Sequence, residues 1–518
     1  MNSHWRIILG FIISVPFLLG TCICHLSCQG ERYDTQPNVV YIFADQFRQF
    51  SLGFWSQDDH ARHIQGNPDP VHTPILDDLA NNGIVFSRAV SNFPLCSPYR
   101  GMLLSGMYPH RNGLMNNCRR DREVQLKDDL TCITDVFSDA GYEVAYFGKC
   151  HWQKTEPLFD ESGNYVGTTE PPGGHYVNHY DTYVPPGPSR HSVDYFFQLL
   201  KDDHFNPRCY SNDPKNVGGL KDGELYLPKR FSSEVEAASI KNYLSNTHNQ
   251  RDPKKPFFLI WSMNPPHNPW TAESTYMPFF DQYTEDGVVK LDQLLTRENA
   301  DSTVGHYAPY YFANVSAVDY FIGEVMQRLD ELDLDKNTIV VFSSDHGEML
   351  GSHGRSGKNN PKIESFAIPF IIHWAEKLQH RIEDLVISVP DVMPTLLGLA
   401  GLEAMIPSGM QGKNYASILT SRVQPEMKKP KSALFLHNTS RGIYTGRYMF
   451  IVKEQGGELE EAYCYDNSKD PYQMEQIPFD ELDAEVGAKL RKELYALLLQ
   501  TNDSWIQENI CVSFLQDG

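Results

Sequence analysis

Short apolar runs recur along the chain, and most of them end in polar residues. The first is NVVYIFAD at 38–45, which is continuously apolar and ends in a carboxylate. Runs of this kind are typical of strands that are buried on both faces of a mostly parallel sheet. We therefore expect strands at 38–45, 144–149, 257–263, 339–345 and 369–373.

Segments with helical signals alternate with these strands. Thr73-Pro74 begins a helix that Gly83 ends, because proline suits the first turn of a helix and glycine suits its C-terminal cap. Further helices are expected at about 131–140 and 310–332. The alternation predicts an α/β fold, a large mixed and mostly parallel sheet sandwiched by helices. Sites in such sheets form at the C-terminal ends of strands, where the polar residues of this chain gather.

Residues 153–230 depart from the alternation. They are rich in Pro, Gly, His and Asp and show little periodicity, so we expect a long loop insertion that rims the site. The histidines of this insertion are better explained by a polar loop surface than by a metal site.

The pattern changes again after about residue 425. Short strands are expected at 433–437, 442–452 and 462–465, followed by an amphipathic helix at about 484–500. The sequence thus predicts two parts, a large α/β domain at 36–424 and a smaller C-terminal α+β domain with an antiparallel sheet at 425–518. A length of 518 residues agrees with two domains.

The N-terminus has the composition of an export signal. Arg6 precedes a short apolar run at 7–20, which is too short for a comfortable bilayer span. Residues 1–28 are therefore expected to be a signal peptide, with a lipoprotein signal as the alternative. The mature protein would be periplasmic, secreted or lipid-anchored at the cell surface, with no transmembrane span.

Charge and cysteine content narrow the function further. The formal net charge of −21 argues against nucleic acid as a partner, because such binding depends on many Lys and Arg contacts to phosphate. Removal of residues 1–28 leaves seven cysteines. That odd number suits one unpaired Cys96 and up to three disulfide pairs.

The stretch CSPYRGMLLSG at 96–106 carries the most chemistry. Pro98 suits the first position of a helix, which would place Cys96 at the positive end of the helix dipole. Arg100 can lean back toward the same point, because helical side chains tilt toward the N-terminus. This arrangement suits a nucleophile that faces an anionic substrate.

The same stretch resembles the signature of the formylglycine-dependent (type I) sulfatases of the alkaline-phosphatase-like superfamily. That signature is Cys-x-Pro-x-Arg, four further residues and a Ser/Thr-Gly pair. YDNSKDPYQMEQIP at 465–478 is similar to a segment near the C-terminus of many sulfatases, and the resemblance covers roughly residues 36–500. It implies that a separate maturation enzyme oxidises Cys96 to formylglycine (3-oxoalanine), whose hydrate attacks the sulfur of a sulfate ester.

The resemblance also implies a divalent cation at two strand ends. Asp45, Gln46, Asp345, His346 and the modified Cys96 would hold Ca²⁺, with Mg²⁺ as the alternative. Two residues depart from the family pattern, which commonly has Asp at the position of Gln46 and often Asn at that of His346. Gln46 still offers a carbonyl oxygen. His346 is a poorer ligand for a hard cation, and it would instead orient a ligand or contact the sulfate.

Further motifs supply the remaining roles that the family implies. Lys149, in Gly-Lys-x-His, and Lys358 would bind sulfate oxygens beside Arg100, and Arg355 is a rival of Lys358. His151 would act as the base for sulfate release, and His267, in NPPHNP, would protonate the leaving oxygen. Taken alone, Lys149 and His151 are equally well explained by a solvated loop. An isolated His267 is better explained by a structural role, and only the context of the other motifs favours the acid.

The expected substrate is a sulfated carbohydrate. Basic and aromatic residues are the candidates for sugar contacts: Tyr176, His179, Arg190, His191, His204, Arg208 and Arg355. Two alternatives stay open, a phosphonate or phosphodiester hydrolase with the same machinery, and a non-catalytic glycan-binding protein in which Cys96 is unconverted.

Overall fold

A computed structural model gives the fold and describes residues 36–119, 121–155, 181–200, 204–421, 428–508 and 511–516. The expected signal peptide at 1–28 and the predicted domain boundary at 424–425 lie outside these residues, and both stay predictions. None of the helices in the described ranges combines the length and the apolar composition that a membrane crossing requires.

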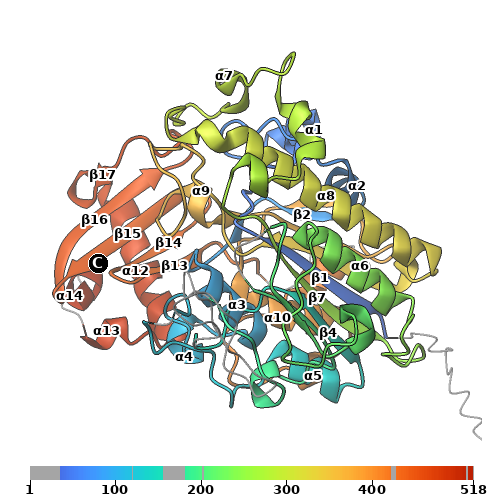
Figure 1. Cartoon of the computed structure of the whole chain (residues 1–518). Coiled ribbons are helices and arrows are strands. Elements are labelled where there is room, and N and C mark those ends of the chain that lie inside the picture. The colour runs from blue at the N-terminus through green and yellow to red at the C-terminus, as the bar shows by residue number, and fades with distance from the viewer. Residues whose placement is uncertain are drawn as a thin grey trace, which may run out of the picture. The chain divides into compact units, whose positions relative to one another are not determined.

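A nine-stranded mixed sheet forms the centre of the fold (Figure 1). Its strand order is β11-β2-β10-β8-β1-β7-β4-β5-β6, and the five strands from β8 to β5 run parallel. The bounds are β1 Asn38–Asp45, β2 Ile84–Phe86, β4 Glu143–Gly148, β5 Tyr195–Leu199, β6 Cys209–Ser211, β7 Phe257–Pro266, β8 Thr338–Ser344, β10 Phe370–His373 and β11 Arg381–Glu383.

Helices cover both faces of this sheet because the central strands are apolar on both sides. Val40 and Ile42 of β1 pack in the same cluster as α2 Pro74–Asn82, α6 Ser232–Leu244 and α8 Ala308–Glu331. Their neighbours Val39, Tyr41 and Phe43 pack in a second cluster with α3, α5 and α10. The bounds of these helices are α3 Cys96–Ser105, α5 Ile133–Asp139 and α10 Val389–Leu399. This confirms the predicted α/β sandwich.

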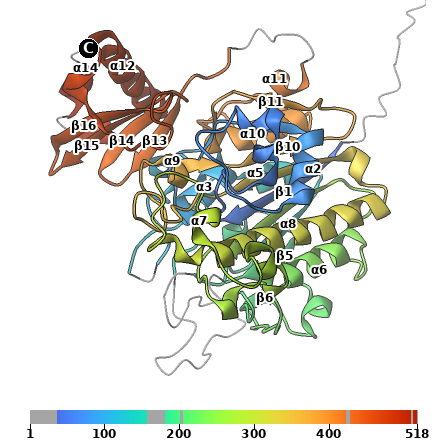
Figure 2. The ribbon, with the colours of Figure 1, turned by 90° about the horizontal axis from the view of Figure 1, so that it is seen from above.

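A separate five-stranded antiparallel sheet follows, set off to one side of the main sheet in Figure 2. Its strands are β13 Ala433–His437, β14 Ser440–Tyr444, β15 Tyr448–Gln455, β16 Glu458–Asp466 and β17 Ile477–Pro478, in that order. α12 Ala484–Thr501 packs on it through an apolar stripe that includes Leu490, Leu494 and Leu498. The Asp483 side chain caps this helix by accepting hydrogen bonds from the Glu485 and Val486 amides.

Smaller elements complete the described chain. A three-stranded sheet joins β12, β3 and β9. The remaining bounds are β3 Ala89–Val90, β9 Ala367–Ile368, β12 Ile387–Ser388, α1 Asp58–Ala61, α4 Pro109–Asn112, α7 Leu291–Leu294, α9 Ile363–Phe366, α11 Ala416–Thr420, α13 Trp505–Glu508 and α14 Cys511–Gln516.

Three local predictions are wrong. Residues 153–230 are not all loop, because β5 and β6 within them extend the main sheet. The single strand expected at 442–452 is a hairpin, β14 and β15, that turns at Gly446 with φ +81°. The disulfide pairs are also wrong within the described residues, since Cys96, Cys118, Cys132, Cys150, Cys209 and Cys464 are all free thiols.

Candidate active site

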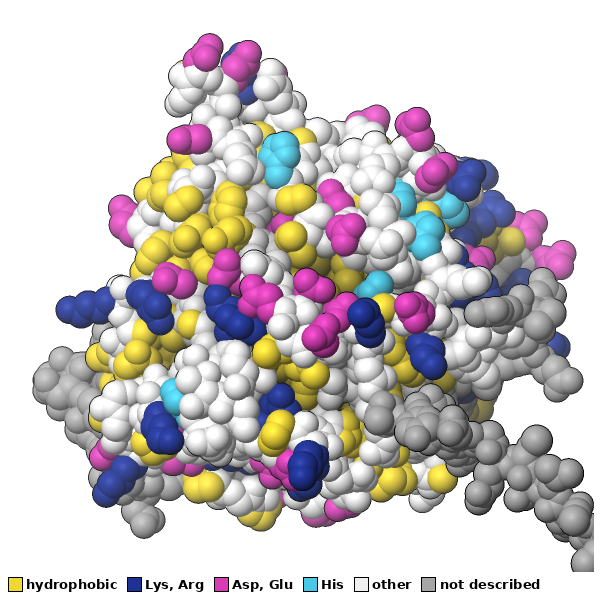
Figure 3. Space-filling model, turned by 90° about the vertical axis from the view of Figure 1, so that its right-hand side faces the viewer, with side chains coloured by type: hydrophobic (Ala, Val, Ile, Leu, Met, Phe, Trp, Pro, Cys, Tyr) yellow, Lys and Arg dark blue, Asp and Glu magenta, His cyan; other side chains and the backbone are white. Residues whose placement is uncertain are grey.

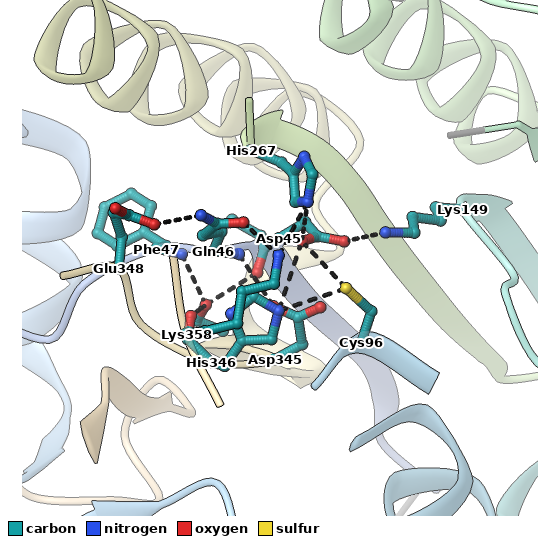
Figure 4. A network of polar contacts seen from close by, with 12 residues as sticks. Asp45, Gln46, Phe47, Cys96, Lys149, His267, Asp345, His346, Glu348 and Lys358 are labelled. Carbon is teal, nitrogen blue, oxygen red and sulfur yellow. Dashed lines mark hydrogen bonds and ion pairs between the residues drawn. The ribbon is translucent and has the colours of Figure 1, made fainter. Parts of the chain in front are cut away.

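The predicted catalytic and metal residues meet at the C-terminal edge of the main sheet (Figure 4). Because β1, β4, β7 and β8 run parallel, the residues at their C-terminal ends gather at one edge. The strand ends and the N-terminus of α3 together place Asp45, Gln46, Cys96, Lys149, His267, Asp345 and His346 around one point, and Lys358 reaches in from the chain beyond β8.

Cys96 is the first residue of α3, two positions earlier than the start predicted at Pro98. Pro98 is tolerated there because amides of the first turn have no partner within the helix. The Cys96 sulfur lies 3.3 Å from His346 Nε2 and 3.8 Å from Asp45 Oδ1. Burial alone would raise the pKa of Cys96, but the charges of Lys149, Lys358 and His346 lower it well below its usual value. The surroundings of position 96 therefore stabilise a negative charge on its side chain.

Arg100 supports the two carboxylates. Its Nη1 donates to Asp345 Oδ2 at 2.8 Å, and its Nη2 lies 3.3 Å from Asp45 Oδ2. The same guanidinium donates to the Cys96 carbonyl and to the Ser262 hydroxyl. Through these contacts, Arg100 fixes the positions of both carboxylates and of the first turn of α3.

The carboxylates fit a bound cation. Asp45, Cys96, Asp345 and His346 each offer a ligand atom, and these four atoms lie within 4.8 Å of one another. Burial and the neighbouring Asp45 charge raise the pKa of Asp345, whereas Lys149, His267 and Arg100 hold the pKa of Asp45 below its usual value despite burial. The two carboxylates therefore compete for the positive charge that surrounds them. Carboxylate oxygens suit Ca²⁺ or Mg²⁺, whereas the His346 nitrogen suits a hard cation poorly.

Gln46 is held by hydrogen bonds on every polar group. Its backbone N–H donates to Asp345 Oδ1 at 2.9 Å. In its side chain, Nε2 donates to Glu348 and Oε1 accepts from Lys358 Nζ. The predicted ligand oxygen therefore points at a lysine, and its role as a metal ligand stays a prediction.

Lys149, Lys358 and His267 form a basic arc over the carboxylates. Lys149 pairs with Asp45, and Lys358 Nζ lies 2.9 Å from His267 Nε2. His267 Nδ1 lies 2.8 Å from the Asn268 carbonyl oxygen, which can only accept, so Nδ1 carries a proton. The His267 Nε2 is thereby left to face the site.

His151 also contacts Cys96. Its Nε2 lies 3.0 Å from the Cys118 carbonyl oxygen and therefore donates to it, and Nδ1 is buried with no hydrogen bond of normal geometry to any described residue. Burial lowers the pKa of His151 against the opposing effect of its contact with Cys96. A neutral imidazole with a free nitrogen is suited to accept a proton.

Two residues of the site were not predicted. Glu348, four residues after β8, accepts hydrogen bonds from Gln46 Nε2, from the Tyr307 hydroxyl at 2.6 Å and from the Gly357 amide. Glu348 ends the motif SSDHGE, so the sequence showed an acidic residue close to Asp345. Nothing in the sequence shows that it turns toward Gln46, and Tyr307 carried no signal at all.

The structure gives several predicted sugar-contact residues internal partners instead. His204 is buried, and its Nε2 lies 2.7 Å from the His267 carbonyl oxygen, so it positions His267. The Arg190 guanidinium is buried against Asp222 and stacks over Phe196 at 4.0 Å, which is a structural role. His191 is buried beside Asp135. Arg208 is half-buried and Arg355 is exposed, while Tyr176 and His179 lie outside the described residues.

Comparisons with known proteins agree with this geometry. The family model described as Sulfatase matches residues 37–402, and that described as N-sulphoglucosamine sulphohydrolase, C-terminal, matches 351–500. The chain is 38 % identical over 516 residues to an endo-4-O-sulfatase of Bacteroides thetaiotaomicron, which covers 94 % of this chain and 96 % of the relative. It is 28 % identical to an ulvan-active sulfatase of Formosa agariphila, over 93 % of this chain and 87 % of the relative. A solved structure described under the metabolism of multiple glycosaminoglycans by Bacteroides thetaiotaomicron superposes with a TM-score of 0.84 at 38 % identity, over 92 % of this chain and 99 % of that one.

Proposed function

Because this chain belongs to the sulfatase family, we propose that it hydrolyses O-sulfate esters of a sulfated carbohydrate, with Cys96 converted to formylglycine as the nucleophile. The observation that carries the proposal is the convergence of two carboxylates, three cationic side chains and three histidines on position 96. The relatives named as endo-4-O-sulfatase and ulvan-active sulfatase support a glycan as substrate.

The charge of the site suits this reaction. The chain carries a formal charge of −21, yet Lys149 and Arg100 are buried beside the nucleophile and Lys358 is half-buried there. Lys149 and Lys358 can bind the sulfuryl oxygens, whose charge develops as the ester bond breaks. Confinement of this positive charge to the pocket allows an acidic protein to bind an anionic group.

Asp45 and Asp345 would hold Ca²⁺ beside residue 96, with Mg²⁺ as the alternative. Such a cation lowers the pKa of the nucleophilic hydroxyl and polarises a sulfate oxygen when it is bound. Arg100 keeps both carboxylates in place, and His346 lies between Asp345 and the Cys96 sulfur.

Two histidines divide the proton transfers. When the bond between sulfur and the sugar oxygen breaks, that oxygen takes the Nε2 proton of His267 in its imidazolium form, and the neutral ring that remains keeps its proton on Nδ1. Lys358 lies 2.9 Å from Nε2. His151 Nδ1 would accept the proton that leaves the side chain of residue 96 as sulfate is released, and its burial and its contact with Cys96 support this role. The residues Asn268 and Cys118 hold the two rings in these orientations through their carbonyl oxygens.

The test combines peptide mass spectrometry with a substrate panel. Protein made with a maturation enzyme should yield a peptide containing residue 96 that is lighter by the difference between a thiol and an aldehyde. It should release inorganic sulfate from 4-O-sulfated glycan polymers and oligosaccharides, and Cys96→Ala should fold but release none. Faster turnover of phosphodiesters or phosphonates would overturn the sulfatase assignment. Full sulfate release by protein that retains the thiol would overturn the nucleophile.

The role of His267 has its own test. We expect His267→Ala to slow alkyl and sugar sulfates far more than activated aryl sulfates, because an aryl oxide leaves without prior protonation. Measurement of kcat/KM across a series of leaving groups would show a steeper dependence on leaving-group pKa than in the unaltered enzyme. Equal losses for all leaving groups would remove His267 from the acid role.

Export belongs to the same proposal. Residues 1–28 would direct the chain out of the cytoplasm. Outside the cytoplasm, extracellular or periplasmic glycans are accessible to the enzyme. Cell fractionation together with N-terminal sequencing of the mature protein tests this, and an intact N-terminus in the cytoplasmic fraction would contradict it.

A further inference from the structure

We propose that Cys132, Asp135 and His191 form a second metal site, which binds Zn²⁺ and is built from residues that take no part in the catalytic cluster. Each of these side chains offers one ligand atom, and the three atoms lie within 4.8 Å of one another. Cys132 and Asp135 lie at the start of α5, and His191 follows the short 3-10 helix Pro188–Arg190.

The spacing agrees with a tetrahedral site. His191 Nδ1 lies 3.6 Å from Asp135 Oδ2, which is longer than a normal N–H···O hydrogen bond. In a tetrahedral zinc site with metal–ligand bonds of 2.0–2.3 Å, two ligand atoms are separated by roughly 3.4 Å. The pair is therefore closer to the separation of two ligands of one cation than to that of a hydrogen-bonded pair.

The His191 ring is buried and turns one nitrogen toward Asp135. Its side chain is 3 % exposed, and Nδ1 is the nitrogen that lies 3.6 Å from Asp135 Oδ2. A cation bound between Nδ1, Asp135 and Cys132 would interact with this nitrogen at a separation that is too long for a hydrogen bond to the carboxylate. Nε2 lies outside this site, and it is buried without a hydrogen-bond partner among the described residues.

The chemical types of the three ligands favour zinc over calcium and magnesium. A thiolate, an imidazole and a carboxylate together suit zinc, whereas calcium and magnesium prefer oxygen donors alone. Three protein ligands leave a fourth position for water. Solvent can reach this position because Asp135 is 21 % exposed and the adjacent Ser192 is exposed.

The ligands are already oriented by neighbouring groups. The Cys132 sulfur accepts from the Asp135 amide, and Asp135 Oδ2 accepts from the Cys132 amide at 2.8 Å. Asp135 Oδ1 accepts from the Ser192 hydroxyl at 2.7 Å. Arg190 fixes the turn that carries His191 through its bonds to Asp222 and to the Val184 carbonyl. Outer hydrogen bonds of this kind are typical of metal sites, where they orient the ligands.

Zinc binding requires the Cys132 thiol to lose its proton. Burial and the Asp135 charge raise the pKa of Cys132 well above its usual value, so the thiol stays protonated in the absence of a cation. On binding, the S–H bond is replaced by a sulfur–zinc bond, and the proton passes to water or buffer. Two negative ligands then balance the charge of the cation. The site would tie the start of α5 to the turn ahead of β5.

The test uses Zn²⁺ and Co²⁺ as probes in full-length protein that carries Cys96→Ala and is saturated with Ca²⁺. This background removes the active-site thiol, so that any cobalt–sulfur charge-transfer band must come from another cysteine. We expect a single equivalent of Zn²⁺ to bind and raise the midpoint of thermal unfolding. Co²⁺ should give a sulfur charge-transfer band with the visible absorption of a tetrahedral site.

Variants at the ligands decide the assignment. Cys132→Ala and His191→Gln should each lose the band and the zinc-dependent shift of the midpoint, whereas Cys464→Ala, which removes a buried free thiol elsewhere, should keep both. Circular dichroism without metal would establish that each variant folds. Absence of a sulfur band at excess Co²⁺, or its persistence in Cys132→Ala, would overturn the proposal.

Discussion

Gln46 shows at the scale of one residue why a neutral side chain suits its place. A carboxylate could accept from Lys358 but could not donate to Glu348, whereas the amide does both. Its backbone adopts φ +67°, and its carbonyl accepts from the Tyr311 hydroxyl at 2.8 Å. Gln46 thus links Lys358 to a buried carboxylate, and it makes this cluster less negative by one charge than an aspartate at the same position would.

Glu348 is therefore expected to be a positioning residue. We predict that Glu348→Ala lowers kcat/KM by about 10–100-fold, the range found when outer-shell partners of metal sites are removed. Glu348→Gln, which can still accept from Gln46, should lose less. Tyr307→Phe is the matched control because it removes only one hydrogen bond to the same carboxylate.

Steady-state kinetics with sulfate esters, together with unfolding curves, would separate this effect from a loss of fold. An unchanged kcat/KM in a folded Glu348→Ala protein would show that Gln46 needs no support from this side.

At the scale of elements, the end of β4 leaves no room for a side chain beside β7 where it brings Lys149 to the site. Gly148 has φ +98°, and a Cβ atom there would lie 2.0 Å from the Ser262 carbonyl oxygen. The next amide, that of Lys149, donates to this same oxygen at 3.0 Å. The glycine is thus a condition for the close packing of the two strands.

A pair of glycine substitutions tests this packing. We expect Gly148→Ala to destabilise the fold by about 3 kcal/mol or more, because backbone strain and a clash with backbone add together. Gly141→Ala should cost only about 1–2 kcal/mol, since φ is +90° there but nothing lies within 4 Å of the added carbon. Urea unfolding measures both, and equal losses would contradict the role of Ser262.

The contact between α6 and β7 contains a buried acid. Glu236 Oε2 accepts from Trp261 Nε1 at 2.8 Å, and Oε1 has no hydrogen-bond partner among the described residues. Burial raises the pKa of Glu236 to about 8, and the Trp261 bond only partly offsets this. The folded protein therefore keeps a proton that the unfolded chain releases above its ordinary pKa.

The stability of the fold should depend on pH accordingly. Between the ordinary pKa of a glutamate and about 8, the folded state binds more protons, so the free energy of unfolding falls as pH rises. The slope from this residue is at most about 1.4 kcal/mol per pH unit. Glu236→Gln should remove that slope and be more stable than the unaltered protein at pH 8. Parallel pH profiles of the two proteins in urea unfolding would contradict the prediction.

Predictability also differs between elements. The run at 38–45 and the helix at 74–82 carry their own signals, apolar continuity and paired Pro and Gly caps, and both were predicted correctly. The apolar strand YFFQL at 195–199 was missed because the surrounding composition is that of a loop. The edge strand β6 has only three residues, and its place depends on pairing with β5, which no local pattern encodes.

For the whole molecule, the sequence predicted which strand ends meet, but it did not predict which hydrogen-bond and ion-pair partners the side chains take. Asp45 and Asp345 could be brought together by the rule that parallel strands expose their C-terminal ends at one edge, whereas Cys96, at the start of α3, was joined to them by the family resemblance. The internal partners of Arg190 and His204 depend on side-chain directions that emerge only from the packed fold. On the described part of the face in Figure 3, acidic and basic side chains are interspersed rather than gathered by sign.

A bound cation should couple the active site to global stability. Two buried carboxylates repel each other, so Ca²⁺ that binds only the folded state stabilises it, by about 2.7 kcal/mol at a free concentration of 100 Kd. We expect dialysis against a chelator to lower both sulfatase activity and the unfolding midpoint, and added Ca²⁺ to restore both.

Asp345→Asn serves as the control, since it should fold yet respond weakly to Ca²⁺. A midpoint that stays the same with chelator and with Ca²⁺ would show that the carboxylates need no cation.

The burial of Cys96 limits the time during which an enzyme can modify it. The Cys96 side chain is 1 % exposed, and its neighbour His346 is 250 residues further along the chain. At translation rates of 5–20 residues per second, roughly 12–50 s pass between the synthesis of these two residues. An oxidising enzyme can reach the thiol freely only in that interval or before the nascent chain collapses. Once native, an unconverted molecule would stay inert however much of that enzyme surrounds it.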